Sequence, residues 1–138
     1  MRSVVSASSV KPFDLVREWR KKMGFAIISK EAIMEKTYLH TGIPVKAKMD
    51  GMSYMEALRV WIGNNTEYGI EYLYWEKDTP AAYRMVKETH VAYKVADVEA
   101  AIKESGGKVL LPKMDLGGGV AIAFVSIDNG PVVEFYQG

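Results

Sequence analysis

From residue 38 onward, the apolar residues gather in short runs rich in β-branched and aromatic residues, a pattern that predicts strands. Residues 38–45 form the first run, residues 58–62 the second and residues 70–75 the third. The segment 63–69, Gly-Asn-Asn-Thr-Glu-Tyr-Gly, has the composition of a turn. We therefore expect the second and third runs to form a hairpin.

The pattern of residues 77–138 predicts a connector, then one strand, one helix and three strands. Asp97 can cap the amino end of the helix, and Gly106 with Gly107 can terminate it. Turn-forming residues at 117–119 and 128–131 separate the last three strands. The predicted bounds are 77–87 for the connector, with one helical turn at 81–86, then 90–95, 97–104, 108–111, 120–127 and 132–136.

The first 35 residues differ in character from the rest and are predicted to be an N-terminal extension. Residues 1–33 carry seven Lys/Arg against three Asp/Glu, whereas residues 34–138 carry eleven against fourteen. A short amphipathic helix is predicted to begin near Pro12 and to end near Gly24. Its apolar stripe consists of Leu15, Val16, Trp19 and Met23. It could dock on the rest of the chain, or residues 1–33 could be an accessory leader preceding Met34.

Composition limits the class of protein. The chain has 138 residues, enough for one ordinary domain, and its 49% hydrophobic and 25% charged residues argue against disorder, collagen-like repeats and coiled coils. The net charge of +1 gives no reason to expect a nucleic-acid partner. No run approaches the roughly 18 to 20 apolar residues that span a bilayer, so we expect a cytoplasmic protein without a membrane partner.

The sequence has only two histidines, His40 and His90, and each opens a predicted strand in a similar local pattern. Each half also ends in an apolar strand that carries one glutamate, Glu71 in the first half and Glu134 in the second. Carboxylates are uncommon in strands and are rarely buried without a partner. The matching positions therefore indicate an internal duplication and require an explanation.

A divalent metal would supply that explanation. The chain has no cysteine, so a metal must be held by nitrogen and oxygen atoms. Two neutral imidazoles and two carboxylates give a neutral site with a 2+ ion and leave coordination positions open. The plainer alternatives are hydrogen-bonded structural histidines and solvent-facing carboxylates, and Glu67 or Glu76 could replace Glu71 as a ligand.

Two segments resemble a known family: THVAYKVADVEAAIKESGGKVL (89–110) and VAIAFVSIDNGPVVEFYQ (120–137). With the order βαβββ, they are similar to the second module of glyoxalase and bleomycin-resistance proteins of the vicinal oxygen chelate superfamily. HTGIPV (40–45) and YGIEYLYWEKDTP (68–80) resemble the first module of short bacterial members of unassigned function. The resemblance covers about residues 36–137.

The resemblance implies an α+β fold of paired βαβββ modules, in which a curved, mostly antiparallel sheet surrounds a metal cleft. Residues 36–138 would be one glyoxalase-like domain, with module one at 36–76, a connector at 77–88 and module two at 89–138. Only 31 positions separate His40 from Glu71, whereas 44 separate His90 from Glu134, so the first module is expected to be shortened. A turn of helix could lie within residues 49–56, or the leader helix could cover the exposed face instead.

The resemblance also implies the site. In this family the first and last strands of each module supply the metal ligands, which here would be His40, Glu71, His90 and Glu134. The expected cofactor is one divalent ion, Ni, Co, Fe, Mn or Zn. This ligand set is closer to the isomerase and lyase members than to the resistance proteins, which generally lack the ligands.

From strand parity we expect the pocket to be lined by Leu73, Trp75, Val132 and Tyr136, although each could equally be core. Glu71 or Glu134 would be the catalytic base for isomerase, epimerase or lyase chemistry on a small substrate with two neighbouring oxygens. A non-catalytic protein that sequesters a drug or metabolite is the alternative. We also expect a homodimer, because a shortened first module leaves an edge or face to cover.

Overall fold

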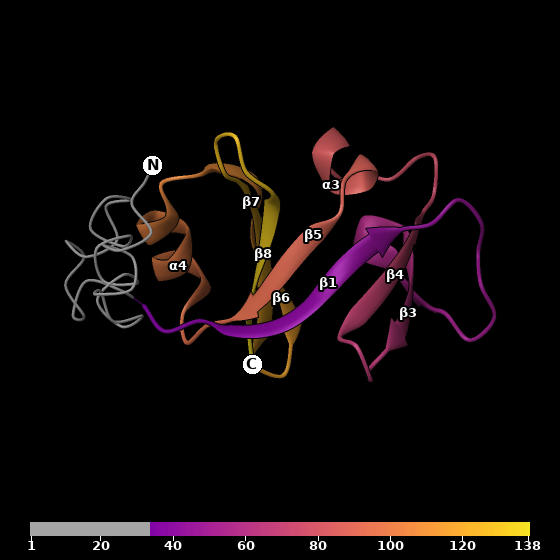
Figure 1. Ribbon diagram of the computed structural model, residues 1–138, viewed down its shortest axis with the longest axis horizontal. Helices are drawn as coiled ribbons and strands as arrows, with labels where there is room; N and C mark the ends of the chain where they lie inside the picture. The colour runs from indigo at the N-terminus through magenta and orange to yellow at the C-terminus, as the bar shows by residue number, and fades with distance from the viewer. Residues whose placement is uncertain (1–33) are drawn as a thin grey trace, which may run out of the picture. The chain divides into compact units, whose positions relative to one another are not determined.

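The computed structural model describes residues 34–138, and residues 1–33, with the helix predicted there, lie outside the described range (Figure 1). The described residues form an α+β unit that is mostly strand. In chain order its elements are β1 (Thr37–Pro44), β2 (Ser53–Met55), the 3₁₀ helix η3 (Glu56–Leu58), β3 (Val60–Asn65), β4 (Ile70–Trp75), α3 (Tyr83–Lys87), β5 (His90–Lys94), α4 (Val98–Ser105), β6 (Lys108–Gly117), β7 (Val120–Ser126) and β8 (Val132–Gln137).

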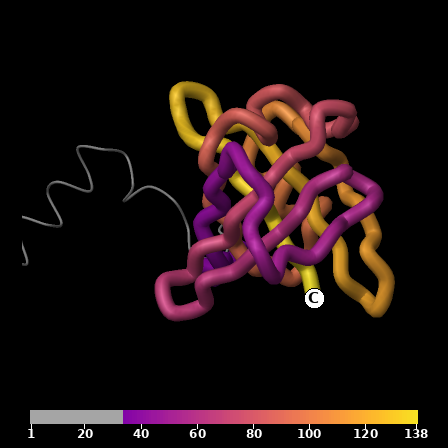
Figure 2. The backbone as a smooth tube through the Cα atoms, turned by 90° about the vertical axis from the view of Figure 1, so that its right-hand side faces the viewer, coloured from indigo at the N-terminus to yellow at the C-terminus, as the bar shows by residue number. Residues whose placement is uncertain are grey.

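The strands form one mixed sheet in the order β2-β3-β4-β1-β5-β8-β7-β6. Two pairs are parallel, β1 with β4 and β5 with β8, and the other five pairs are antiparallel. The sheet curls (Figure 2), and residues of β3 and β4 on one side and of β6 and β7 on the other line the same hollow. The two central strands, β1 and β5, therefore form the floor of that hollow.

Helix α4 covers the outer face of the sheet behind β7 and β8. Its amino end is capped as the sequence predicts, because the Asp97 side chain accepts a hydrogen bond from the backbone N–H of Ala100. Gly106 ends the helix with a φ of 65°. Val98 and Ala101 are fully buried against Val125 and neighbouring strand residues, which makes this the outer core of the unit.

No helix within residues 34–138 covers the outer face of the sheet behind β3 and β4 in the way that α4 covers β7 and β8. The turn of helix considered for residues 49–56 is wrong, because most of that segment is a turn and the short strand β2. A cluster of polar and aromatic side chains lies on this outer face instead. Tyr54 and Trp61 lie 4.7 Å apart between ring centroids, Lys48 Nζ lies 3.7 Å from the Trp61 ring, and Glu76 accepts hydrogen bonds from both rings.

The inner core lies on the concave face. It joins residues that are far apart in the chain: Val60 and Leu73 from β3 and β4, and Phe124 and Val132 from β7 and β8. Met85 of α3 is fully buried in the same cluster. This buried cluster therefore includes residues from both halves of the curled sheet.

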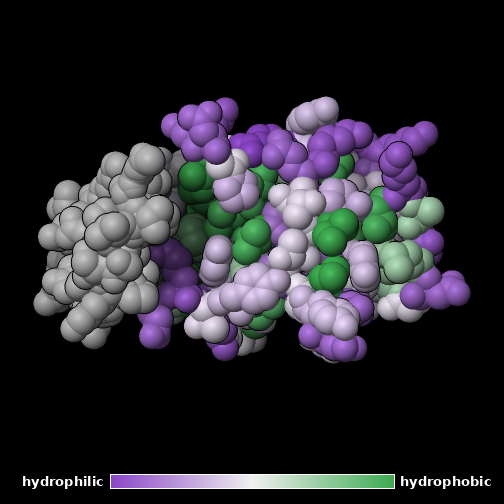
Figure 3. Space-filling view, in the orientation of Figure 1, coloured by the Kyte–Doolittle hydropathy of each residue, from purple (hydrophilic) through white to green (hydrophobic). Residues whose placement is uncertain are grey.

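On the face shown in Figure 3, hydrophobic side chains gather over the middle of the described unit, and strongly hydrophilic ones line its upper edge. Among residues 34–138, no helix is long and apolar enough to cross a membrane.

Candidate metal centre

Four neighbouring strands bring together one chemically active side chain each: His40 from β1, Glu71 from β4, His90 from β5 and Glu134 from β8. Sheet register explains the convergence. Gly42 pairs with Glu71 on one side and with His90 on the other. In the same way, Ala92 pairs with His40 and with Glu134.

Gly42 follows His40 by two residues on β1 and lies opposite His90. In the same way, Ala92 follows His90 by two residues on β5 and lies opposite His40. A Cβ atom added to Gly42 would lie 2.0 Å from His90 Cε1, well inside the van der Waals limit. Ala92 is fully buried. The small residues leave the room that the two imidazoles need to face each other at the floor of the hollow.

The donor atoms are close to one another. The His40 Nε2 atom lies 3.2 Å from a carboxylate oxygen of Glu71 and 3.2 Å from one of Glu134. His90 Nε2 lies 3.0 Å from that Glu134 oxygen and 3.4 Å from His40 Nε2. All four donor atoms lie within 4.8 Å of one another.

These separations fit a shared divalent ion. Nitrogen and oxygen ligands about 2.1 Å from one ion lie about 3.0 Å apart at a right angle and about 3.4 Å apart at the tetrahedral angle. Four of the six donor–donor separations, from 3.0 to 3.4 Å, cover that interval. Two imidazoles and two carboxylates are also a donor set that first-row divalent metals accept. The four residues could therefore hold a metal ion.

The two halves of the site differ in exposure. The His90 side chain is completely buried, and the Glu134 side chain is 8% exposed, whereas His40 and Glu71 are 14% and 17% exposed. Glu134 contacts both imidazoles, but Glu71 contacts only His40. Glu134 is therefore the more firmly held carboxylate of the site, and Glu71 is the more exposed and less constrained one.

The electrostatics follow from this packing. Burial lowers the pKa of His40, but the hydrogen bonds and negative charges of Glu134 and Glu71 outweigh burial and raise that pKa to about 9. Burial raises the pKa of Glu134, and the two imidazoles more than offset it, so that this pKa lies below its usual range. Without a metal, the cluster holds a protonated His40 between two carboxylates at neutral pH.

One buried polar atom of the site lacks a partner. His90 Nδ1 makes no hydrogen bond with any described residue, while its Nε2 faces the other donors. The ring is held by packing instead, between Gly42 and Phe124, whose ring lies nearly perpendicular to it at 5.0 Å between centroids. Metal-ligating imidazoles normally donate their other ring N–H to an acceptor, so His90 lacks that support among the described residues, while its Nε2 atom is directed at the other donors.

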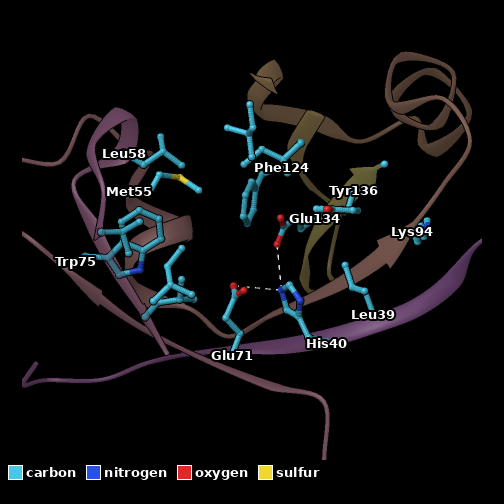
Figure 4. A pocket seen from close by; sticks show the side chains of 16 residues that line it. Leu39, His40, Met55, Leu58, Glu71, Trp75, Lys94, Phe124, Glu134 and Tyr136 are labelled. Atoms are coloured by element: carbon cyan, nitrogen blue, oxygen red, sulfur yellow. Dashed lines mark hydrogen bonds and ion pairs between the residues drawn. The ribbon is translucent and has the colours of Figure 1, made fainter. Parts of the chain in front are cut away.

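A cavity of about 460 Å³ opens beside the cluster. Figure 4 shows His40, Glu71 and Glu134 pointing toward one another at its base, with Trp75, Met55 and Leu58 on one side and Phe124 and Tyr136 on the other. His90 lies beneath this surface, since it is fully buried.

Three of the four predicted pocket residues, Leu73, Trp75 and Tyr136, line this cavity. Val132 does not, because it is fully buried in the inner core. The alternation of side chains along β8 correctly predicted the face of the sheet on which Val132 lies, but it did not predict that Val132 is fully buried. Sequence reasoning missed most of the wall, because these residues come together only when the sheet curls: Leu39, Met55, Leu58, Val60, Ile62, Lys94, Leu116, Ile122, Phe124 and Gly138.

The two alternative glutamates lie elsewhere. Glu76 binds the Tyr54 hydroxyl and the Trp61 indole N–H in the outer cluster, and Glu67 lies exposed in the turn between β3 and β4. Neither belongs to the group of donors that could hold a metal within residues 34–138.

Comparisons with known proteins address the fold alone. No protein-family model matches the sequence, and no curated protein matches it. A hypothetical protein from Bacillus halodurans has a similar crystal structure, with a TM-score of 0.56 and 22% identity, covering 75% of this chain and 95% of that chain. The chain therefore shares a curled mixed sheet with that protein.

Proposed function

We propose that this chain is a metal-dependent protein of the glyoxalase-like, vicinal oxygen chelate type, acting as an isomerase, epimerase or lyase on a small substrate with two neighbouring oxygens. The observation that carries the proposal is the convergence of His40, Glu71, His90 and Glu134, with all donor atoms within 4.8 Å of one another beside an open cavity.

The symmetry of the sheet supports the family assignment. In each half, the strand that bears the histidine pairs in parallel with the strand that bears the glutamate, β1 with β4 and β5 with β8. The two histidine strands then pair with each other in the centre. This is the arrangement expected of two βαβββ modules in which the first has lost its helix.

A bound divalent ion would supply Lewis-acid stabilisation of negative charge that develops on substrate oxygens. His90 and Glu134, the more deeply buried pair, would keep the site rigid. Both glutamates line the cavity, but Glu71 contacts only His40 and is the more exposed, so its carboxylate is the better placed of the two to take a proton from a carbon beside a substrate carbonyl. A substrate that fills the cavity would displace water from the apolar wall around the reacting atoms.

The first experiment is elemental analysis of protein purified without an affinity metal, beside the double variant His40→Ala, His90→Ala. We expect about one divalent ion per wild-type chain and none in the variant. Metal-replete protein should then turn over at least one compound from a panel of hydroxycarbonyls and dicarbonyls. The assay would detect exchange of the substrate proton for deuterium from deuterated water. A wild-type chain that stays metal-free after reconstitution would overturn the proposal.

A second candidate function is sequestration of a planar apolar ligand without catalysis. The indole of Trp75 on the cavity wall favours it, because aromatic side chains bind flat ligands well. Binding of such a ligand by the chelator-treated protein, with no proton exchange in the metal-loaded one, would support sequestration.

The homodimer also stays a proposal. It is tested by sedimentation equilibrium of the full chain over a hundredfold range of concentration, where a single monomer mass throughout would contradict it.

A further inference from the structure

The wall of the cavity is apolar on the side of β2, η3, β3 and β4. The lining side chains there are Met55, Leu58, Val60, Ile62, Leu73 and Trp75. We call these six residues the apolar lobe. Figure 4 shows Met55, Leu58 and Trp75 gathered on the far side of Glu71 from His40.

Polar groups on the rest of the wall are few. Among the described lining residues, the charged ones are His40, Glu71 and Glu134 of the metal centre and the exposed Lys94. The apolar lobe offers no hydroxyl, amide or charge, and its one polar atom, Trp75 Nε1, is buried from solvent. A ligand group in the lobe would therefore find no hydrogen-bond partner that it can reach.

We propose that the substrate carries a bulky apolar group, an aryl or branched alkyl substituent, next to its pair of metal-binding oxygens, and that the apolar lobe binds this group. The inference rests on the function proposed above and narrows its substrate class.

Two physical arguments carry this step. Burying an aromatic ring or branched alkyl group against apolar walls is favourable, because it removes apolar surface from water. Burying a hydroxyl or amide without a hydrogen-bond partner is unfavourable, because the group loses its hydrogen bonds to water. The lobe therefore selects for apolar substituents and against polyhydroxylated or peptide-like ones.

Placement gives the orientation of the substrate. Glu71 stands between the lobe and His40, and Leu73 and Trp75 follow it on the same face of β4. A substrate whose oxygens lie at the donor cluster thus extends its substituent along β4 toward Trp75. The carbon that loses a proton then lies beside the Glu71 carboxylate.

Hydroxamates test the inference, because they present two neighbouring oxygens to a metal and tolerate varied substituents. Calorimetric titrations of metal-reconstituted full-length protein would compare acetohydroxamate, phenylacetohydroxamate and gluconohydroxamate. We expect the phenyl compound to bind at least about tenfold more tightly than the methyl compound. The polyhydroxylated compound should bind no more tightly than the methyl one.

Two matched variants test which part of the cavity wall produces the preference for the phenyl compound. Met55→Gln places a polar group of similar length in the lobe, and Leu116→Gln makes the same kind of change on β6, at the other end of the sheet. We expect Met55→Gln to reduce the phenyl preference to less than about threefold, while Leu116→Gln retains it. The metal content should be the same in both variants, because neither residue is among the four donors, and this shows that the metal centre is intact.

The outcomes separate the two proposals. If the protein binds metal and acetohydroxamate but shows no phenyl preference, the apolar substrate class is wrong and the proposed function stands. Loss of the preference in Leu116→Gln but not in Met55→Gln would also overturn the inference. If the protein takes up no metal, the proposed function is wrong and the inference falls with it.

Discussion

Gly42 lies directly against the imidazole of His90. The two residues are register partners on β1 and β5, and a Cβ atom on Gly42 would come within 2.0 to 2.6 Å of three ring atoms of His90. The metal centre therefore depends on the absence of a side chain at this position. Glycine is required here for close approach rather than for an unusual backbone angle.

Gly42→Ala should remove metal binding, because the new methyl group would push the buried His90 ring out of the donor cluster. We also expect a loss of about 1 to 3 kcal/mol in the free energy of unfolding from overpacking. Elemental analysis and urea unfolding would measure both effects. Gly63→Ala is the matched control, because its nearest contact is the flexible side chain of Met52 at 3.3 Å. A Gly42→Ala protein with full metal content would contradict this role.

The two glutamates should differ in their variants. Glu134→Gln should lower metal affinity by at least about tenfold, since changes to groups that merely support ligands already cost that much. Glu71→Gln should retain more metal but lose turnover, because Glu71 contacts only His40 and is the more exposed of the two carboxylates. Metal titration of each variant, followed by proton-exchange assays at saturating metal, separates binding from catalysis. Equal effects of the two substitutions on metal affinity would contradict the asymmetry.

Metal binding should release a proton from His40. Its pKa in the metal-free protein is about 9, so at pH 7 the ring is protonated and must lose that proton to become a ligand. Apparent metal affinity should therefore rise by about tenfold per pH unit from pH 7 toward pH 9 and then level off. Calorimetry in two buffers of different ionisation enthalpy measures the released proton, and its absence at pH 7 would contradict the raised pKa.

The raised pKa of His40 also predicts how the stability of the metal-free protein depends on pH. Because the folded-state pKa of His40 lies above its ordinary value of 6.5, the protonated ring stabilises the fold below about pH 6.5. That contribution should be lost as the pH rises through 9. Urea unfolding of chelator-treated protein between pH 6 and 10 would measure it, with His40→Ala as the control that lacks this part of the pH dependence.

Asp97→Ala should destabilise the protein without affecting the metal centre. The substitution removes the side-chain cap that Asp97 gives to the backbone N–H of Ala100, a loss of about 1 kcal/mol. Asp97→Asn should recover most of the difference, because an amide oxygen can accept the same hydrogen bond. Urea unfolding measures the change, and elemental analysis should find unchanged metal content.

Local patterns predicted most of the elements. The bounds of β4 agree with the predicted run 70–75, and Asp97 and Gly106 bracket α4 as expected, because turns and caps depend on neighbouring residues. Segments with weak local signals were less predictable. The strand β2 was missed, and β6 runs to Gly117, well beyond its predicted end, because pairing with β7 extends it.

By itself the sequence determined the four candidate ligands, since two histidines and two strand glutamates in matching positions are a chemical pattern that needs no coordinates. Tertiary structure alone decided that their donor atoms meet, because this depends on register across β4, β1, β5 and β8. It also decided that Glu134 bridges both imidazoles, that Gly42 makes room for His90, and that Val132 is core. How deeply a side chain is buried and which side chains it contacts depend on the curl of the whole sheet, and no local run of residues encodes that curl.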